Sequence, residues 1–421
     1  MKTLSVQNQA ELSPIAPVMD TASEQSLPRK HWVRRIENII RCGTLKMTLP
    51  DGSSHTLSGK ERTEPTADIE IHHYRALRRL LLHGDMGLAE AYLEGEWSTS
   101  DLSTLLAFGI ANEQKLENAS ARWSLTRLMA RIRHLLNSNS RNQAKKNIAY
   151  HYDLGNDFYR RWLDQSMTYS AAIFDPASTD SVEDLAQAQH RKYARLAETL
   201  GIENGDDVLE IGCGWGGFMQ HVIENTKAQV TGVSISKEQC AYATQRIAKI
   251  DADNRGSILF KDYRDLEGRY DRIASIEMFE AVGEKYWPTY AGKLKQLLKP
   301  DGVAALQIIT IDENRFECYK NSADFIQRYI FPGGMLPSRT ALRELMAEHG
   351  LRITEEFCFG PDYAETLRRW RTNFDAAWPE ISTLGFDERF KRMWHYYLAY
   401  CEVGFDHGAI DVVQIRVEHD S

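Results

Sequence analysis

The sequence lacks the marks of a membrane-spanning or secreted protein. No stretch approaches the roughly 18 consecutive apolar residues that cross a bilayer, and residues 1–30 lack the basic-then-apolar layout of a signal peptide. The six cysteines include no C-x-x-C pair and are irregularly spaced, which indicates free thiols in a reducing compartment and predicts no disulfides and no metal site. We therefore expect a cytoplasmic protein whose contact with a membrane is peripheral.

An excess of positive charge is also missing. The 421 residues hold 51 Lys+Arg against 59 Asp+Glu, a formal net charge of −8, which argues against a dedicated nucleic-acid partner. Hydrophobic residues make up 43% and charged residues 26%, as in ordinary soluble globular chains, so a disordered or collagen-like protein is excluded. The length favours two domains over a single core.

Shifts in sequence character predict the domain organisation. We expect a flexible tail (1–30), a smaller α+β domain (31–112), a linker (113–147) and an α/β domain (148–421). In the smaller domain, a turn at 50–52 between alternating segments predicts a hairpin. The linker holds a leucine stripe between Leu125 and Leu136, with arginines mostly off the stripe. That amphipathic helix either lies on a membrane surface or packs against the α/β domain.

From residue 148 onward, strands alternate with helices. Apolar runs at 207–211, 228–233, 270–276 and 302–311 alternate with helical segments such as 217–224 and 237–250. This order predicts an α/β fold with a parallel, doubly wound, Rossmann-like sheet.

The most informative motif is a glycine-rich turn directly after the 207–211 strand. Gly212, Gly214 and Gly217 satisfy G-x-G-x-x-G, and glycines let the backbone turn tightly and approach a nucleotide-like ligand. A dinucleotide site normally has an acid at the tip of the next strand, but 231–234 contain none. Glu210, inside the first strand, is placed to fix the loop or to receive the cationic end of a methyl donor. A Glu satisfied by backbone N–H groups is the plainer alternative.

Further blocks give the sequence a resemblance to the S-adenosylmethionine-dependent cyclopropane-fatty-acyl-phospholipid synthases and mycolic-acid cyclopropane synthases. The blocks are, in order, 147–159, 167–170, 210–218, 234–239, 261–266, 278–280 and 329–338. In addition, 87–97 resembles the N-terminal domain of the phospholipid-acting branch. The resemblance implies a class I methyltransferase domain preceded by a smaller lipid-associated domain.

The resemblance also implies S-adenosylmethionine as the methyl donor. Together with Glu210, the residues expected to line it are Tyr169, Ser170, Gly212, Gly214, Ser234, Ile235, Gln239, Tyr263 and Arg264. Gln239 would contact the ribose, which agrees with the missing acid at the end of the second strand.

The implied reaction has two steps. A lipid alkene attacks the sulfonium methyl without a general base, in a dry apolar cavity where aromatic faces shield the carbocation. A bicarbonate ion then removes a proton. Of the groups that hold this ion in the family, Glu280, the backbone of Ile309 and Tyr363 are present, whereas Ala171 replaces a Cys and Gln307 replaces a His.

Glu277 is a further departure, because it stands where the family has Gly before Met-Phe-Glu. Its negative charge disfavours a bound anion. Either bicarbonate binds weakly, or Glu277 or Glu280 is itself the base, or Glu277 points away from the site. The candidate catalytic residues are Glu277, Glu280, Gln307, Ile309 and Tyr363.

The predicted activity is transfer of a methyl(ene) group to the double bond of an unsaturated acyl chain in membrane phospholipid, giving a cyclopropane fatty acid. Proton loss from a neighbouring carbon would instead give a methyl-branched or methylene product. Two other hypotheses are a methyltransferase for a small amine or oxygen nucleophile and a non-catalytic lipid-binding protein. The sequence leaves a homodimer open.

Overall fold

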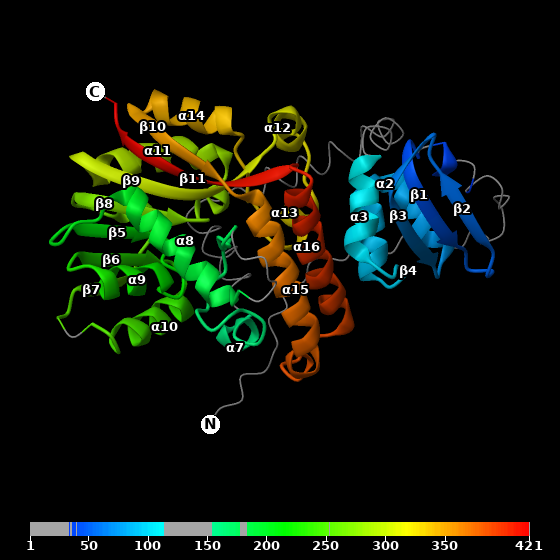
Figure 1. Ribbon diagram of the computed structural model, residues 1–421, viewed down its shortest axis with the longest axis horizontal. Coiled ribbons are helices and arrows are strands. Elements are labelled where there is room, and N and C mark those ends of the chain that lie inside the picture. Colours follow the sequence, from blue (N-terminus) through cyan, green and yellow to red (C-terminus); the bar gives the residue numbers. More distant parts are fainter. Residues whose placement is uncertain are drawn as a thin grey trace.

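The computed structural model describes residues 33, 36–38, 40–112, 154–176, 183–251 and 253–420. Two sheets organise them (Figure 1). The smaller sheet has the order β2-β1-β3-β4, from β1 (Cys42–Thr48), β2 (Ser54–Ser58), β3 (Glu61–Ile71) and β4 (Trp97–Ser98). The predicted hairpin is confirmed, since β1 pairs antiparallel with β2 and Gly52 turns between them at φ +80°.

Two helices, α2 (Tyr74–Leu93) and α3 (Leu102–Ala111), lie between the smaller sheet and the rest of the molecule (Figure 1). Tyr92 of α2 packs its ring against Tyr396, with centroids 5.7 Å apart, and Glu90 pairs with Arg328 at 3.0 Å. One apolar cluster runs from the smaller sheet into the larger part. The predicted tail and linker, with its basic helix, lie outside the described residues, so the domain boundaries stay a prediction.

The larger sheet has seven strands in the order β10-β11-β9-β8-β5-β6-β7. They are β5 (Asp207–Ile211), β6 (Gln229–Ser234), β7 (Gly256–Phe260), β8 (Tyr270–Ile276), β9 (Leu298–Ile311), β10 (Leu351–Cys358) and β11 (Ile410–His419). Strands β5 to β9 pair in parallel, whereas β11 runs antiparallel to both neighbours. The predicted parallel, doubly wound arrangement is confirmed for β5, β6, β8 and β9, whereas β11 was not predicted from the sequence and runs antiparallel.

The reversal of β11 follows from what precedes it. Two long helices, α15 (Gly360–Ser382) and α16 (Glu388–Asp406), form a hairpin between β10 and β11. A single crossover helix carries the chain to the opposite end of a sheet and yields a parallel strand. The α15–α16 hairpin instead returns the chain to the end where β10 finished, so β11 must run back.

Helices cover both faces of the larger sheet, as a doubly wound fold requires. One apolar cluster joins the strands to α11 (Trp287–Leu297) and α14 (Arg339–Glu348), and another joins them to α8 (Leu185–Leu200) and α9 (Gly217–Asn225). The remaining helices are α7 (Asn156–Tyr159), α10 (Lys237–Ile247), α12 (Glu313–Lys320), α13 (Phe325–Tyr329), η1 (Tyr263–Asp265), η2 (Phe279–Ala281) and η3 (Glu284–Tyr286).

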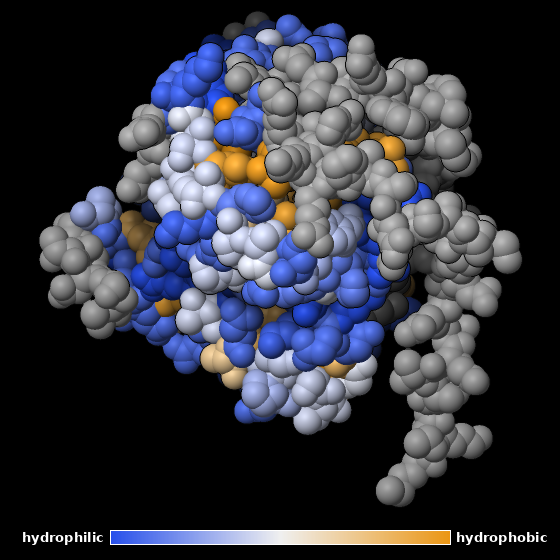
Figure 2. Space-filling model, turned by 90° about the vertical axis from the view of Figure 1, so that its right-hand side faces the viewer, coloured by the Kyte–Doolittle hydropathy of each residue, from blue (hydrophilic) through white to orange (hydrophobic). Residues whose placement is uncertain are grey.

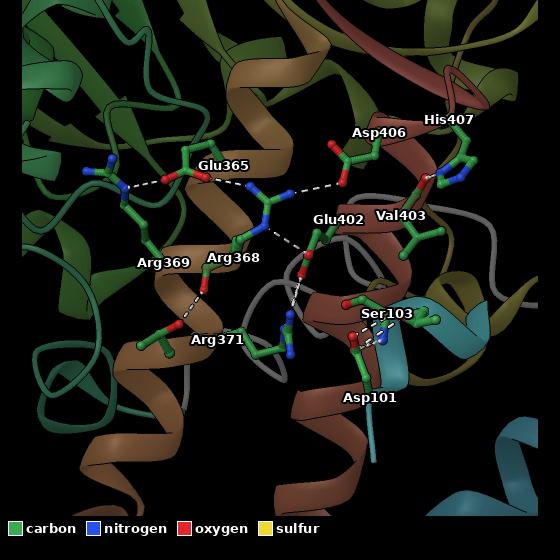
Figure 3. A network of polar contacts seen from close by, with 12 residues as sticks. Asp101, Ser103, Glu365, Arg368, Arg369, Arg371, Glu402, Val403, Asp406 and His407 are labelled. Atoms are coloured by element: carbon green, nitrogen blue, oxygen red, sulfur yellow. Dashed lines mark hydrogen bonds and ion pairs between the residues drawn. The ribbon is translucent and has the colours of Figure 1, made fainter. Parts of the chain in front are cut away.

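An ion-pair network holds α15 against α16 (Figure 3). Arg368 of α15 contacts Glu365 on its own helix and reaches Glu402 and Asp406 of α16, while Arg371 donates to Glu402 at 2.9 Å. Exposed ion pairs contribute little, but the Glu402 side chain is only 4% exposed, so losing its cationic partners would leave a buried charge uncompensated. The network therefore fixes α15 and α16, which both contribute tyrosines to the site described below.

Among the described residues, no helix is both long and apolar enough to cross a membrane. On the face that carries the smaller sheet, the described residues expose apolar atoms between polar side chains (Figure 2).

Candidate active site

The glycine turn lies at the carboxyl end of β5, in the middle of the larger sheet. Gly212 has φ +84° and Gly214 φ +50°, a backbone region that favours glycine. The N–H groups of Gly212 and Cys213 donate to the Val233 carbonyl at 2.9 and 3.0 Å, which ties the tips of β5 and β6 together. A Cβ at Gly212 would meet the Met278 side chain at 2.8 Å, whereas one at Gly214 would meet nothing within 4 Å. Gly214 thus faces open space.

The tips of β6 and β7 bring polar groups to the same edge. Ser234 donates to the Gln239 side chain at 2.9 Å, and Ile235 lies in the turn before α10. After β7, the buried carboxylate of Asp262 holds the Arg264 guanidinium at 2.6 Å. Asp262 was not among the residues predicted from the sequence, although an acid directly after a strand at this edge was a usable signal.

The segment around Tyr169 and Ser170 lies beside the glycine turn. Tyr193 of α8 connects the two, because its hydroxyl bonds Thr168 at 2.8 Å and occupies the space that a Cβ at Gly217 would need. The Tyr169 hydroxyl bonds that of Tyr397 at 2.7 Å. Residues predicted from four separate blocks therefore meet at one edge of the sheet, while their roles as donor contacts stay predictions.

Glu210 fixes the glycine loop and has one carboxylate oxygen without a hydrogen-bond partner among the described residues, and its contact with a methyl donor stays a prediction. Its side chain accepts a hydrogen bond from the Met219 backbone at the start of α9, which fixes the loop. Its other carboxylate oxygen, Oε2, is buried without a hydrogen-bond partner among the described residues. Burial raises the Glu210 pKa to about 8, against the opposing charge of Lys192.

These residues fit S-adenosylmethionine. Gly214 leaves room for a ligand to approach the backbone, the buried Glu210 carboxyl has an oxygen without a hydrogen-bond partner among the described residues, and the buried Ser234–Gln239 pair offers hydroxyl and amide groups to a ribose.

The second half of the site is built around Glu277, which follows β8. Its carboxylate accepts hydrogen bonds from Ala171 N–H at 2.8 Å, Gln307 Nε2 at 2.7 Å and the Tyr363 hydroxyl at 2.7 Å. The alternative in which Glu277 points away from the other predicted catalytic residues is therefore wrong. Gln307 is itself oriented, because its Oε1 accepts from Gln414 Nε2 at 3.0 Å and its Nε2 thus faces Glu277.

Glu277 adopts this position at a backbone φ of +48°, one of three described non-glycine residues with positive φ. A residue with a Cβ in this region costs roughly 1–2 kcal/mol. Such strain persists only where the surroundings determine the conformation. Here the three donors to the carboxylate do so.

Glu280 is the second acid of the site. One oxygen accepts from Ile309 N–H at 2.5 Å, and the other is buried without a hydrogen-bond partner among the described residues. Burial, followed by the nearby charge of Glu277, raises the Glu280 pKa to about 8. Burial also raises the Glu277 pKa, but Tyr363, Ala171 and Lys192 oppose that effect. Glu280 is therefore mostly protonated at neutral pH, whereas the donors and the cation around Glu277 favour the ionised form of that carboxylate.

A bicarbonate ion does not fit this arrangement. Gln307, Tyr363 and the Ala171 N–H already donate to the carboxylate of Glu277. The structure does bring together the predicted residues Glu277, Glu280, Gln307, Ile309 and Tyr363, but with a carboxylate of the chain itself at their centre.

Two further residues of the site, both on α8, were not predicted from the sequence. Lys192 and Gln189 are fully buried and both bind Ser170, through its hydroxyl at 2.7 Å and its carbonyl at 2.9 Å. Their spacing, with Tyr193 and Leu196, puts polar groups on the buried face of an amphipathic helix. That mismatch was the available signal.

This seven-stranded, doubly wound sheet, with its antiparallel β11 and its open glycine turn, has the fold of the class I S-adenosylmethionine-dependent methyltransferases. The family model "Mycolic acid cyclopropane synthetase" matches residues 139–415, and the chain belongs to this family. Tuberculostearic acid methyltransferase UfaA1 of Mycobacterium tuberculosis is 42% identical over 376 residues, which cover 88% of this chain and 86% of that protein. Cyclopropane-fatty-acyl-phospholipid synthase of Escherichia coli is 37% identical over 392 residues, 93% of this chain and 94% of that protein.

A solved structure agrees with these matches. Mycolic acid cyclopropane synthase CmaA1 complexed with SAH and CTAB superposes with a TM-score of 0.60 at 30% identity, covering 65% of this chain and 97% of that one. The chain is therefore an S-adenosylmethionine-dependent methyltransferase of a family that modifies fatty acids.

Proposed function

We propose that this enzyme methylates the double bond of an unsaturated acyl chain in membrane phospholipid, with Glu277 as a built-in base, and yields a methyl-branched or methylene unsaturated acyl chain. The observation that carries the proposal is the Glu277 carboxylate, which accepts three hydrogen bonds at the centre of the predicted catalytic residues. The enzyme would work in the cytoplasm, at the membrane surface.

S-adenosylmethionine, when bound, supplies an electrophilic methyl group and departs as a neutral thioether. The π electrons of the acyl double bond form the new C–C bond, which leaves a carbocation on the neighbouring carbon. A hydride shift moves the positive charge to the more substituted carbon. Glu277 then takes a proton from a carbon next to that charge, and the C–H electron pair becomes the new double bond. The acyl chain gains one CH2, and one proton resides on Glu277 until solvent removes it.

The position of Glu277 favours branching over ring closure. A cyclopropane requires proton removal from the incoming methyl as the ring forms. Three donors hold the Glu277 carboxylate in one position, so it does not follow the incoming methyl group. A base fixed in this way gives the cation time to rearrange before the proton is lost.

Aromatic side chains from three segments support the cationic stage. Tyr169 packs against Trp370 with centroids 5.2 Å apart, and Trp370 lies edge-on to Tyr363 at 6.1 Å. The Tyr169–Tyr397 hydroxyl bond fixes this cluster to α16. Ring faces stabilise a nearby cation in a site without water, and we infer that these rings do so.

The donor would be held as the resemblance implies. We infer contacts from Tyr169, Ser170, Gly212 and Gly214 to its methionine and ribose portions. Ser234, Ile235 and Gln239 would contact the ribose and adenine, Tyr263 and Arg264 would flank the adenine, and Glu210 would face the cationic end.

Cyclopropane formation is the second candidate. The Escherichia coli synthase matches 93% of this chain, including its N-terminal part, which favours the same product. In that reaction Glu277 would take the proton from the transferred methyl while the ring closes. The first step and the substrate would be unchanged.

The test uses the purified full-length enzyme, S-adenosylmethionine and vesicles of monounsaturated phosphatidylglycerol, with saturated vesicles as the control. Mass spectrometry of the released fatty acids should show a gain of one CH2 from the unsaturated vesicles alone. Mild catalytic hydrogenation should then add two hydrogens to a branched unsaturated product and none to a ring. Unmodified lipid under conditions in which the donor binds would overturn the proposal.

A further inference from the structure

Lys192 is a buried ammonium that the two reaction steps above do not use. It lies on α8 with no exposed surface, and its Nζ donates to the Ser170 hydroxyl at 2.7 Å. Burying a charged group without compensation is costly, so such residues persist where the surroundings need the charge. Its electrostatic partners are Glu277, Asp164 and Glu210, with the strongest interaction to Glu277.

The geometry places Lys192 between the two halves of the site. One turn earlier on α8, Gln189 donates to the Ser170 carbonyl at 2.9 Å, so α8 holds Ser170 through both its carbonyl and its hydroxyl. The next residue, Ala171, donates its N–H to the Glu277 carboxylate. A single segment thus runs from a predicted donor contact to the base, and Lys192 fixes its first residue.

The charges that face these groups come from several elements. Lys192 faces Glu210 on β5, Asp164 before the Ser170 segment and Glu277 after β8, and its ammonium lies 4.3 Å from the centroid of the Tyr193 ring. Glu277 faces Lys192, Glu280 and the Tyr363 hydroxyl. Burial disfavours the ionised form of Glu277, and the positive charge of Lys192 opposes that effect.

We propose that Lys192 is a positioning residue for the methyl transfer, because it fixes the Ser170–Ala171 segment between donor and base and supplies the positive charge that keeps Glu277 ionised. The proposal rests on the proposed function of Glu277 as the base. Burial lowers the Lys192 pKa to about 8, so the side chain remains mostly protonated at neutral pH.

The experiment compares Lys192→Met, Lys192→Gln and Lys192→Arg, each as the full-length chain. Met removes both the charge and the hydrogen bond, Gln keeps a donor for Ser170, and Arg keeps the charge. Lys249→Met, at an exposed lysine of the same domain, is the matched control. The measurements are kcat from pH 5 to 9, the Kd for S-adenosylmethionine by calorimetry, and the melting temperature.

Without the ammonium the Glu277 pKa rises further, so the acidic limb of the kcat profile should move to higher pH in Lys192→Met and Lys192→Gln. A shift of one pH unit corresponds to a roughly tenfold loss of kcat on the acidic side. Lys192→Arg and Lys249→Met should keep the wild-type limb. Lys192→Met should also bind donor more weakly than Lys192→Gln, because it no longer holds Ser170.

The outcomes separate this inference from the proposed function. If Glu277→Gln retains activity, the proposed base is wrong, and the charge role of Lys192 is overturned with it. If Glu277→Gln is inactive while Lys192→Gln keeps the wild-type limb, the inference about Lys192 alone is overturned. If Lys192→Met fails to fold, the comparison is made between Lys192→Gln and Lys192→Arg. An acidic limb of the kcat profile that lies at the same pH in both variants overturns the inference.

Discussion

Replacing Glu277 by Gly tests the proposed base, because glycine removes the carboxylate and fits the φ of +48°. Loss of a general base lowers kcat by about 10²–10⁴-fold. The same change leaves the N–H of Ala171, the amide of Gln307 and the hydroxyl of Tyr363 facing an empty space. A small carboxylate such as formate, or bicarbonate, should bind there and restore part of the activity.

The stability effects can be ranked. Relief of the left-handed backbone contributes about 1 kcal/mol, whereas each hydrogen bond to a charged group contributes about 1.5–3 kcal/mol. Three such bonds are lost, so Glu277→Gly should melt at a lower temperature than wild type. Formate should raise that melting temperature over the same concentration range in which it restores activity.

Glu277→Gln is the matched control, because it keeps the shape of the side chain and cannot act as the base. It should be inactive, and formate should not rescue it, since the amide fills the space. The assay is methyl transfer to monounsaturated vesicles at fixed donor, with donor affinity measured in parallel. Near wild-type activity in Glu277→Gln, or a Glu277→Gly variant that binds donor but shows no rescue by either anion, would refute the reasoning.

Three further predictions concern the same site. Tyr363→Phe removes the donor to Glu277 Oε2, so the pKa of Glu277 should rise and the acidic limb of kcat should move to higher pH; an unchanged limb would remove Tyr363 from the base site. Gly214→Ala should weaken S-adenosylmethionine binding by at least about tenfold, because its Cβ would project toward the predicted ligand. The control Gly201→Ala, also at positive φ with open space around it, should cost about 1–2 kcal/mol of stability without affecting donor affinity. Equal donor affinities in the two variants would contradict this prediction. Burial raises the folded-state pKa of Glu210 and of Glu280 from 4.5 to about 8. The stability contributed by their protonated forms is therefore complete below pH 4.5 and is lost as the pH rises through 8. The melting temperature of the donor-free enzyme should fall between these pH values, and Glu280→Gln should make the melting temperature less dependent on pH.

Local patterns predicted the elements that build the donor half of the site. The strand over 207–211 and the helix that begins at Gly217 were expected, and β5 and α9 confirm them. Apolar runs and glycine turns are determined by residues close together in the chain, so they can be recognised in a single sequence. The direction of β11 did not follow in this way, because it depends on how the α15–α16 hairpin returns the chain.

The base half of the site was predicted as a set of residues but not as an arrangement. Glu277 was expected to disfavour an anion, and the orientation of its carboxylate depends on donors from three segments distant in sequence: Ala171, Gln307 and Tyr363. The role of Lys192 was not predicted, because its hydrogen-bond partner Ser170 is 22 positions away in the sequence. Contacts of that kind are determined by tertiary packing rather than by local periodicity.

The measurement that tests the central claim most directly uses a donor whose methyl group carries ¹³C. After reaction with monounsaturated phosphatidylglycerol vesicles, an NMR spectrum of the extracted lipid reports where the labelled carbon resides. We predict that the label appears as an alkenyl methylene or as a methyl group on a branched unsaturated chain. A strongly shielded cyclopropane carbon would contradict the proposed branching, and lipid without label would contradict methyl transfer to an acyl chain altogether.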